Sequence, residues 1–66
     1  MNHKYVIVEN FGKTYSVMLT DFAYWASVNN QLEKYCEDNK LIFQGILVAG
    51  LREQDVMMFK LAWGEN

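Results

Sequence analysis

The sequence predicts an α+β domain in which a β-β-α-β-β succession forms a four-stranded antiparallel sheet with one helix packed on one face. Two patterns carry this prediction: a central segment repeats apolar residues at helical spacing, and the flanking segments are rich in β-branched and aromatic residues. The chain has 66 residues, enough for one domain but not two, so residues 1–66 are treated as a single domain.

The first two strands are expected at residues 4–11 and 14–19, joined by a two-residue Gly-Lys turn. Glycine suits the first central position of a type II′ turn, because that position needs a positive φ. This turn places Val8 opposite Val17 and fixes which side chains share a face. The face expected under the helix is apolar apart from one hydroxyl, and it consists of Val6, Val8, Tyr15, Val17 and Leu19.

The helix is expected over residues 20–39. Its apolar side chains recur at steps of three and four, so they fall on one side of a helix; they are Phe22, Trp25, Val28, Leu32, Tyr35 and Cys36. Thr20 is the expected N-cap, and Asp21 suits the positive end of the helix dipole. Asn39 is expected to end the helix in the left-handed conformation.

The second half of the chain is expected to add two more strands, at residues 41–50 and 56–63. The intervening residues 51–55 are polar and fit a five-residue hairpin loop. The order of the two hairpins within the sheet does not follow from the sequence.

The predicted sheet carries more apolar residues than one helix can cover. On the face away from the helix we expect nine apolar side chains: Tyr5, Ile7, Phe11, Met18, Ile42, Ile46, Val48, Val56 and Met58. A contiguous apolar patch on a soluble protein usually marks an interaction site. We therefore predict that these residues form an interface, and that the chain pairs with a second copy of itself as a symmetric dimer, through this face or through a sheet edge.

Composition narrows the classes of function. Apolar residues make up 52% of the chain and charged residues 21%, which is typical of a folded domain. The formal net charge of −2 and scattered basic residues argue against nucleic-acid binding. The sequence has neither a signal peptide nor an apolar run long enough to cross a membrane, so we expect no membrane partner and a cytoplasmic location.

One cysteine and one histidine limit the chemistry of the chain. They form no internal disulfide and cannot complete a four-ligand zinc site, so no metal or cofactor is expected. His3 has no acid fixed beside it, and Cys36 lies on the apolar side of the helix, so we expect no catalytic residue and no enzyme activity. A site shared between two chains would have to use His3, Glu9 and Tyr15.

These observations favour a small, non-enzymatic protein-binding module, an inhibitor or adaptor, that acts as a homodimer and binds another protein. Its size and acidity suit the small regulators that phages and mobile elements encode, although no motif supports that origin. An alternative is a small-ligand-binding protein whose pocket lies at the dimer interface, lined by Tyr5, Phe11, Met18 and Met58. Acidic residues on the helix would offer a further surface to a basic partner, or would simply be solvated.

Overall fold

A computed structural model describes residues 4–64 as four strands and two helices. In chain order these are β1 (Tyr5–Glu9), β2 (Tyr15–Leu19), α1 (Phe22–Asp38), β3 (Ile42–Gln44), β4 (Leu47–Leu51) and α2 (Glu53–Trp63). The α+β class, the four-stranded antiparallel sheet and the β-β-α-β-β succession are confirmed. A second helix follows the last strand.

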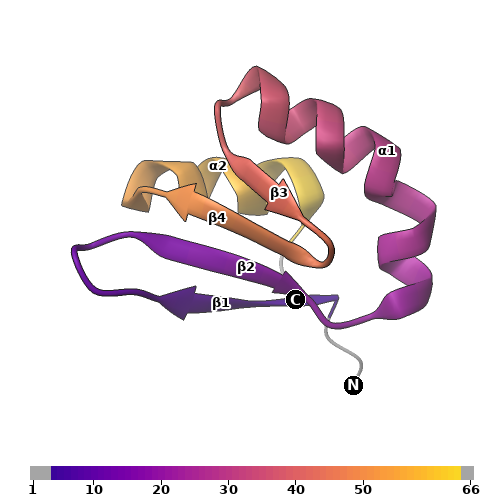
Figure 1. Ribbon diagram of the computed structural model, residues 1–66, viewed down its shortest axis with the longest axis horizontal. Helices are drawn as coiled ribbons and strands as arrows, with labels where there is room; N and C mark the ends of the chain where they lie inside the picture. The colour runs from indigo at the N-terminus through magenta and orange to yellow at the C-terminus, as the bar shows by residue number, and fades with distance from the viewer. Residues whose placement is uncertain (1–3, 65–66) are drawn as a thin grey trace.

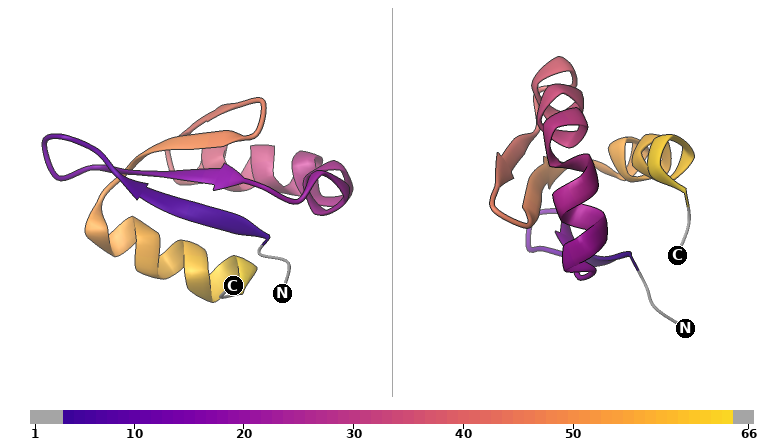
Figure 2. Two further views of the ribbon diagram at one scale, coloured as in Figure 1. Left: turned by 90° about the horizontal axis from the view of Figure 1, so that it is seen from below. Right: turned by 90° about the vertical axis from the view of Figure 1, so that its right-hand side faces the viewer.

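The strand order is β1-β2-β4-β3, so the two hairpins meet at the centre of the sheet through β2 and β4 (Figure 1). Strands β1 and β3 form the two edges. Helix α2 lies behind the sheet, whereas α1 crosses one end of the sheet and continues past β3 (Figures 1 and 2). Both helices contribute to one core on the same side, which leaves the other face of the sheet without a helix.

The core combines residues from both helices and three strands. Its members are at most 2% exposed: Tyr5, Val17, Leu19, Leu32, Cys36, Val48, Leu51 and Phe59. The two buried residues of α1, Leu32 and Cys36, lie on the side that the helical spacing predicted. A shared core of this kind makes the helices and the sheet depend on one another for stability.

Aromatic rings hold α2 against the rest of the core. The Phe59 ring makes edge-to-face contacts with Tyr5 of β1 at 5.2 Å and with Tyr35 of α1 at 5.9 Å between centroids. Tyr35 also contacts Trp63 edge-on at 5.7 Å. The Tyr5 hydroxyl donates a hydrogen bond to the Gly64 carbonyl, just beyond the end of α2. Strand β1 and helix α2 are thus joined by both packing and a polar contact.

The N-cap of helix α1 lies one residue later than the sequence indicated. Asp21, not Thr20, is the N-cap, because its carboxylate accepts a hydrogen bond from the Tyr24 backbone N–H at 3.0 Å. The expected left-handed Asn39 is also wrong: Asn39 has φ −103°, and Lys40 takes the positive φ of 58° instead.

The first hairpin has a register shifted by one residue from the predicted one. Ile7, not Val8, lies opposite Val17, and the connection spans residues 10–14. This connection is longer than the predicted two-residue turn, and both Gly12 and Lys13 within it adopt positive φ, at 82° and 64°. Since neighbouring strand residues point to opposite faces, this shift exchanges the two faces of β1. In β1, the face that carries Tyr5 lies against the core, and Val6 and Val8 point away from the core.

Residues 41–50 form a hairpin, not the single strand that the sequence suggested. The chain turns at Gly45 and Ile46, where Gly45 has a positive φ of 58° that glycine adopts without steric strain. The Gly45 carbonyl also accepts a hydrogen bond from the indole N–H of Trp25 at 2.8 Å, which ties this turn to α1. The turn changes which residues point to each face of the sheet, so Val48 points into the core and not to the open face as predicted.

A β-bulge in β4 adds a second irregularity. Tyr15 pairs with Leu51 while Val17 pairs with Val48, so β4 has one more residue than β2 between these pairs. Gly50 in this stretch has a φ of 82°. The extra residue lets Val48 and Leu51 both point into the core, where each is 0% exposed.

Residues 56–63 are helical, so the predicted fourth strand at this position is wrong. Helix α2 starts after Arg52, whose backbone N–H donates to the Asp55 carboxylate at 2.9 Å and whose guanidinium contacts the same oxygen at 3.2 Å. Val56 is the one β-branched residue in α2, and most of the others are strong helix formers. Local propensity and capping therefore favour a helix over a strand.

Phe59→Ala is expected to lower the free energy of unfolding by about 3–5 kcal/mol, because it removes the ring that joins β1, α1 and α2. Chemical denaturation followed by circular dichroism measures this loss. Leu61→Ala on the same helix is the matched control: Leu61 is 80% exposed, so the change should stay within about 0.5 kcal/mol. Equal losses in the two variants would contradict the described packing of α2.

Candidate interaction surfaces

The face of the sheet that carries no helix is mostly apolar. Strand pairing and the alternation of side chains place eight residues on it: Val6, Val8, Ser16, Met18, Ile42, Gln44, Leu47 and Ala49. We call this set the open sheet face. The exposed fractions of Ile42, Val8, Val6 and Met18 are 58%, 43%, 39% and 38%. None of the eight carries a charge, which is unusual for a sheet face in contact with water.

The central polar residue of the open sheet face is already satisfied within the chain. Ser16 is 9% exposed, and its hydroxyl accepts a hydrogen bond from the Asn10 side-chain amide at 2.8 Å. Covering Ser16 would therefore leave no unpaired hydroxyl behind. Gln44 is exposed on the edge strand β3, where its amide can stay at the rim of a contact.

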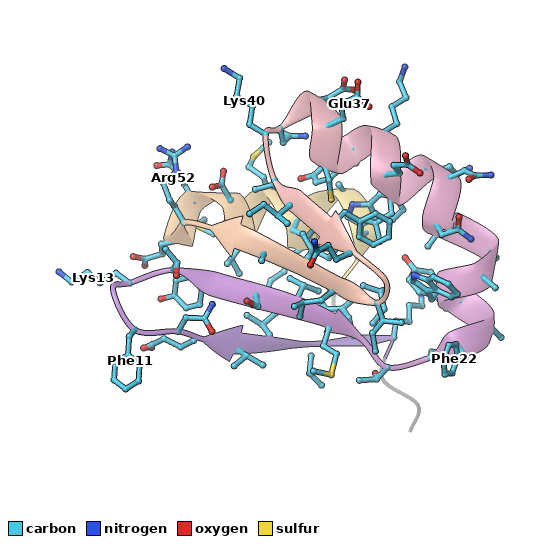
Figure 3. The ribbon with its side chains drawn as sticks, viewed as in Figure 1. Phe11, Lys13, Phe22, Glu37, Lys40 and Arg52 are labelled. Atoms are coloured by element: carbon cyan, nitrogen blue, oxygen red, sulfur yellow. The ribbon has the colours of Figure 1, made fainter. Side chains whose placement is uncertain are left out.

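Charged and aromatic side chains surround this broad side of the molecule. Figure 3 views the molecule from this side, and its labelled side chains Lys13, Lys40 and Arg52 point outward around the sheet. Phe11 projects from the β1–β2 loop, where it is 104% exposed, and Phe22 at the start of α1 is 71% exposed. An apolar centre with a polar rim is the usual anatomy of a protein interface.

A second apolar surface lies on α2, on the side turned away from the core. Met57, Met58 and Leu61 are 64%, 57% and 80% exposed, and we call these three residues the outer stripe of α2. Their spacing of one and three residues places them on one side of the helix. The core side of the same helix carries Phe59 and Trp63, so α2 is apolar on two opposite sides.

The open sheet face and the outer stripe lie on opposite sides of the molecule. Figure 2 shows α2 as a separate layer beneath the strands, so its outer side points away from the sheet. One partner of ordinary size therefore cannot cover both surfaces with one flat contact.

The nine residues predicted to form an interface do not lie on one surface. Tyr5 and Val48 are 1% and 0% exposed, so their predicted exposure on the open face is wrong. The remaining seven fall into separate groups: Met18 and Ile42 on the open sheet face, Phe11 on the loop, Met58 on α2, and Ile7, Ile46 and Val56 packed partly against the core. Whether any of them contacts a partner stays a prediction.

Four residues of the open sheet face were not predicted to lie there: Val6, Val8, Leu47 and Ala49. The one-residue register shift moves the two valines from the predicted helix side to the open face, and the turn at Gly45 displaces the other two. The Gly-Ile-Leu-Val pattern after a short apolar run was a signal for that turn, because glycine inside a strand often marks a break.

Within one chain, the structure does not bring together the four residues assigned to the alternative ligand pocket at the dimer interface, and that pocket stays a prediction. Tyr5 lies in the core, Phe11 at the tip of a loop, Met18 on the open sheet face and Met58 on the far side of α2. These four side chains therefore do not line a common cavity within one chain.

Chemically reactive groups in the described residues are few. Cys36 is 1% exposed, and burial raises the pKa of its thiol to about 11, so it behaves as a small apolar residue as predicted. Across residues 4–64 the cysteine and the acidic side chains form no group that could hold a metal ion. His3 lies outside the described residues. Neither described helix is long and apolar enough to span a membrane.

Comparison with protein-family models, with curated proteins and with solved structures gives no match for this chain. The function proposed below is therefore inferred from the open sheet face and the other exposed apolar residues.

Cys36 is expected to resist thiol reagents while the protein is folded. With a pKa of about 11, its thiolate fraction at pH 8 is at least ~100-fold lower than that of an ordinary cysteine, whose pKa is about 8.5. The rate of reaction with a chromogenic disulfide, measured in buffer and then in denaturant, checks this. Equal rates in the two conditions would show that the thiol is accessible and would contradict its place in the core.

Proposed function

We propose that this protein is a small, non-enzymatic protein-binding module that works as a homodimer, with the open sheet face as the dimer contact. The observation that carries the proposal is an uncharged sheet face with six apolar residues among its eight: Val6, Val8, Met18, Ile42, Leu47 and Ala49. Exposed apolar surface of this extent favours association in water.

The size of this side of the molecule supports a second copy as the occupant. The backbone extends 31 × 27 × 20 Å, and the open sheet face lies on the broad 31 × 27 Å side. A stable protein interface of standard size covers about 800 Å² per partner, so a dimer contact of that size would extend from the open sheet face onto its rim. An identical chain supplies a face of matching size and of the same apolar character, which a two-fold symmetric contact requires.

An approximate free energy of association supports a dimer of moderate affinity. If about 400 Å² of apolar surface were covered on each chain, its burial would contribute roughly 20 kcal/mol at about 25 cal/mol per Å². Association costs roughly 4–15 kcal/mol in lost freedom, with further losses from ordering side chains. The remaining several kcal/mol correspond to dissociation constants around the micromolar range.

The regulatory part of the proposal, an inhibitor or adaptor in the cytoplasm, rests on what the described residues offer. They supply apolar surfaces for contact, and no cluster of their side chains could hold a metal ion. A single buried cysteine is compatible with a reducing compartment, where disulfides are rare. A module of this kind acts by occupying or joining other proteins.

Sedimentation equilibrium at tens of micromolar should give the mass of two chains for the natural sequence. The triple variant Val6→Thr, Val8→Thr and Ile42→Thr should give the mass of one chain, because it places hydroxyl groups on the open sheet face. Threonine keeps the β-branched shape that strands favour, so the fold should persist, and circular dichroism checks that it does.

Leu61→Gln is the matched control, because it makes an exposed residue polar on the opposite side of the molecule. This variant should remain a dimer. A natural protein that sediments as one chain, or a control that dissociates while the triple variant does not, would contradict the proposed dimer contact.

A further inference from the structure

Strand β1 leaves the longer of the two sheet edges open. The strand order places β1 at one edge and β3 at the other. The left view of Figure 2 looks onto the edge at β1, and no described strand or helix crosses in front of it. Strand β3 has only three residues, and α1 lies beside it. The edge at β1 is therefore the more accessible one for another chain.

The hydrogen bonds to β2 determine which backbone groups of β1 point outward. The Asn10 N–H, just beyond β1, donates to the Thr14 carbonyl at 2.8 Å. In an antiparallel pair, residues that bond to the neighbouring strand alternate with residues that do not. The even-numbered residues of β1 therefore bond to β2, and the N–H and C=O groups of Ile7 and Glu9 point away from it. We call these four groups the outer edge of β1.

Strand β1 lacks the features that usually keep an edge strand from pairing with another chain. Those features are a very short strand, a β-bulge, proline and lysine. Strand β1 has five residues, pairs with β2 without a register shift, and contains neither proline nor lysine. A row of outward N–H and C=O groups is satisfied by the matching row of an extended chain. The backbone of β1 therefore specifies a strand as the occupant of its outer edge.

Side chains at the far end of β1 add a preference for particular residues in that strand. Glu9, Asn10 and Phe11 line an open hollow there. Figure 3 shows Phe11 projecting from the loop on the side of β1 that faces away from β2. Within residues 4–64 no cation pairs with the Glu9 carboxylate. An added strand is therefore favoured when it places Lys or Arg opposite Glu9 and an apolar side chain against Phe11.

A second copy of β1 would not supply this cation. A symmetric antiparallel contact bonds the outward groups of odd-numbered residues in the two copies to one another. Glu9 then lies opposite an odd-numbered residue, such as Tyr5 of the second copy. Lys4 is even-numbered, and its ammonium group lies over the Tyr24 ring, 5.1 Å from the centroid. A strand of different sequence therefore suits the outer edge of β1 better than a second copy does.

We propose that the outer edge of β1 binds an extended segment of another protein, which adds to the sheet as a fifth strand. The segment carries Lys or Arg opposite Glu9 and an apolar side chain against Phe11. The inference rests on the proposed function and names how this binding module holds its target. In contacts of this kind, main-chain hydrogen bonds give the affinity and side chains give the sequence preference. The open sheet face stays available for the proposed dimer.

A phage-displayed library of random nine-residue peptides supplies the probe. Peptides that the natural protein retains should alternate β-branched or aromatic residues with polar ones, and they should share a Lys or Arg at one position. The enriched peptide is then synthesised with a fluorescent label, and its affinity is measured by fluorescence anisotropy. A peptide of the same composition in scrambled order is the control.

Amide hydrogen exchange, measured by NMR, locates the bound peptide. Saturating peptide should slow exchange of the Ile7 and Glu9 amides about ten-fold or more, because both acquire an acceptor. The Val6 and Val8 amides should change little, since they already bond to β2. This difference between alternate residues distinguishes an added strand from a peptide that lies on the open sheet face.

Two variants at Glu9 separate the backbone contribution from the charge. Glu9→Pro removes an outward N–H and leaves the bonds to β2 in place, so it should weaken binding of the peptide about ten-fold. Glu9→Gln is the matched variant that keeps the N–H and loses the charge. Its loss of affinity should be smaller, about two- to five-fold, because an exposed ion pair contributes little. Circular dichroism and sedimentation should show the natural fold and mass for both variants.

The proposed strand site is overturned by a library that enriches no peptide, by equal affinity for the enriched and scrambled peptides, or by equal affinity of Glu9→Pro and the natural protein. Slower exchange of the Ile7 and Glu9 amides at higher protein concentration, without peptide, would instead identify a second copy as the occupant. Failure of the dimer is a separate result: the natural protein would sediment as one chain, and peptide binding would be unchanged.

Discussion

The contact between Phe59 of α2 and the rings of Tyr5 and Tyr35 is the constraint on which the rest of the structure depends. These three residues come from the first strand, the first helix and the last helix, and Phe59 is 1% exposed at their junction. The hydrogen bond from the Tyr5 hydroxyl to Gly64 fixes the end of α2 against β1. Both helices are thereby held on one side of the sheet.

This arrangement explains why apolar surface remains on the outside. A chain of 66 residues buries only about 60% of the surface that its unfolded form exposes, so it cannot cover both faces of a four-stranded sheet. With both helices on one side, Val8 and Ile42 stay exposed on the other. Helix α2 supplies Phe59 to the core, and Leu61 lies on the opposite side of the same helix, where it is 80% exposed.

The sequence predicted the features that rest on long, regular patterns and missed those decided by single residues. The spacing from Phe22 to Cys36 spans four turns, so α1 was placed within two residues. Helix α2 has apolar residues on two opposite sides and therefore no clear helical period, and its pattern resembled a strand. The faces of the sheet depended on turns at Gly12 and Gly45, where a one-residue change reverses every side chain. The excess of apolar surface was visible, but of the apolar residues that form the open sheet face only Met18 and Ile42 were predicted there.

The contact between Tyr5 and Phe59 joins residues 54 positions apart in the chain, which affects how the protein forms during synthesis. The first hairpin and α1 are made well before the segment that completes their core. Until Phe59 has been synthesised, Tyr5 and Tyr35 have no ring to pack against, and a nascent chain at that stage exposes still more apolar surface. Folding therefore has to wait for the last helix, and a ribosome that stalls before α2 would hold a chain prone to aggregation.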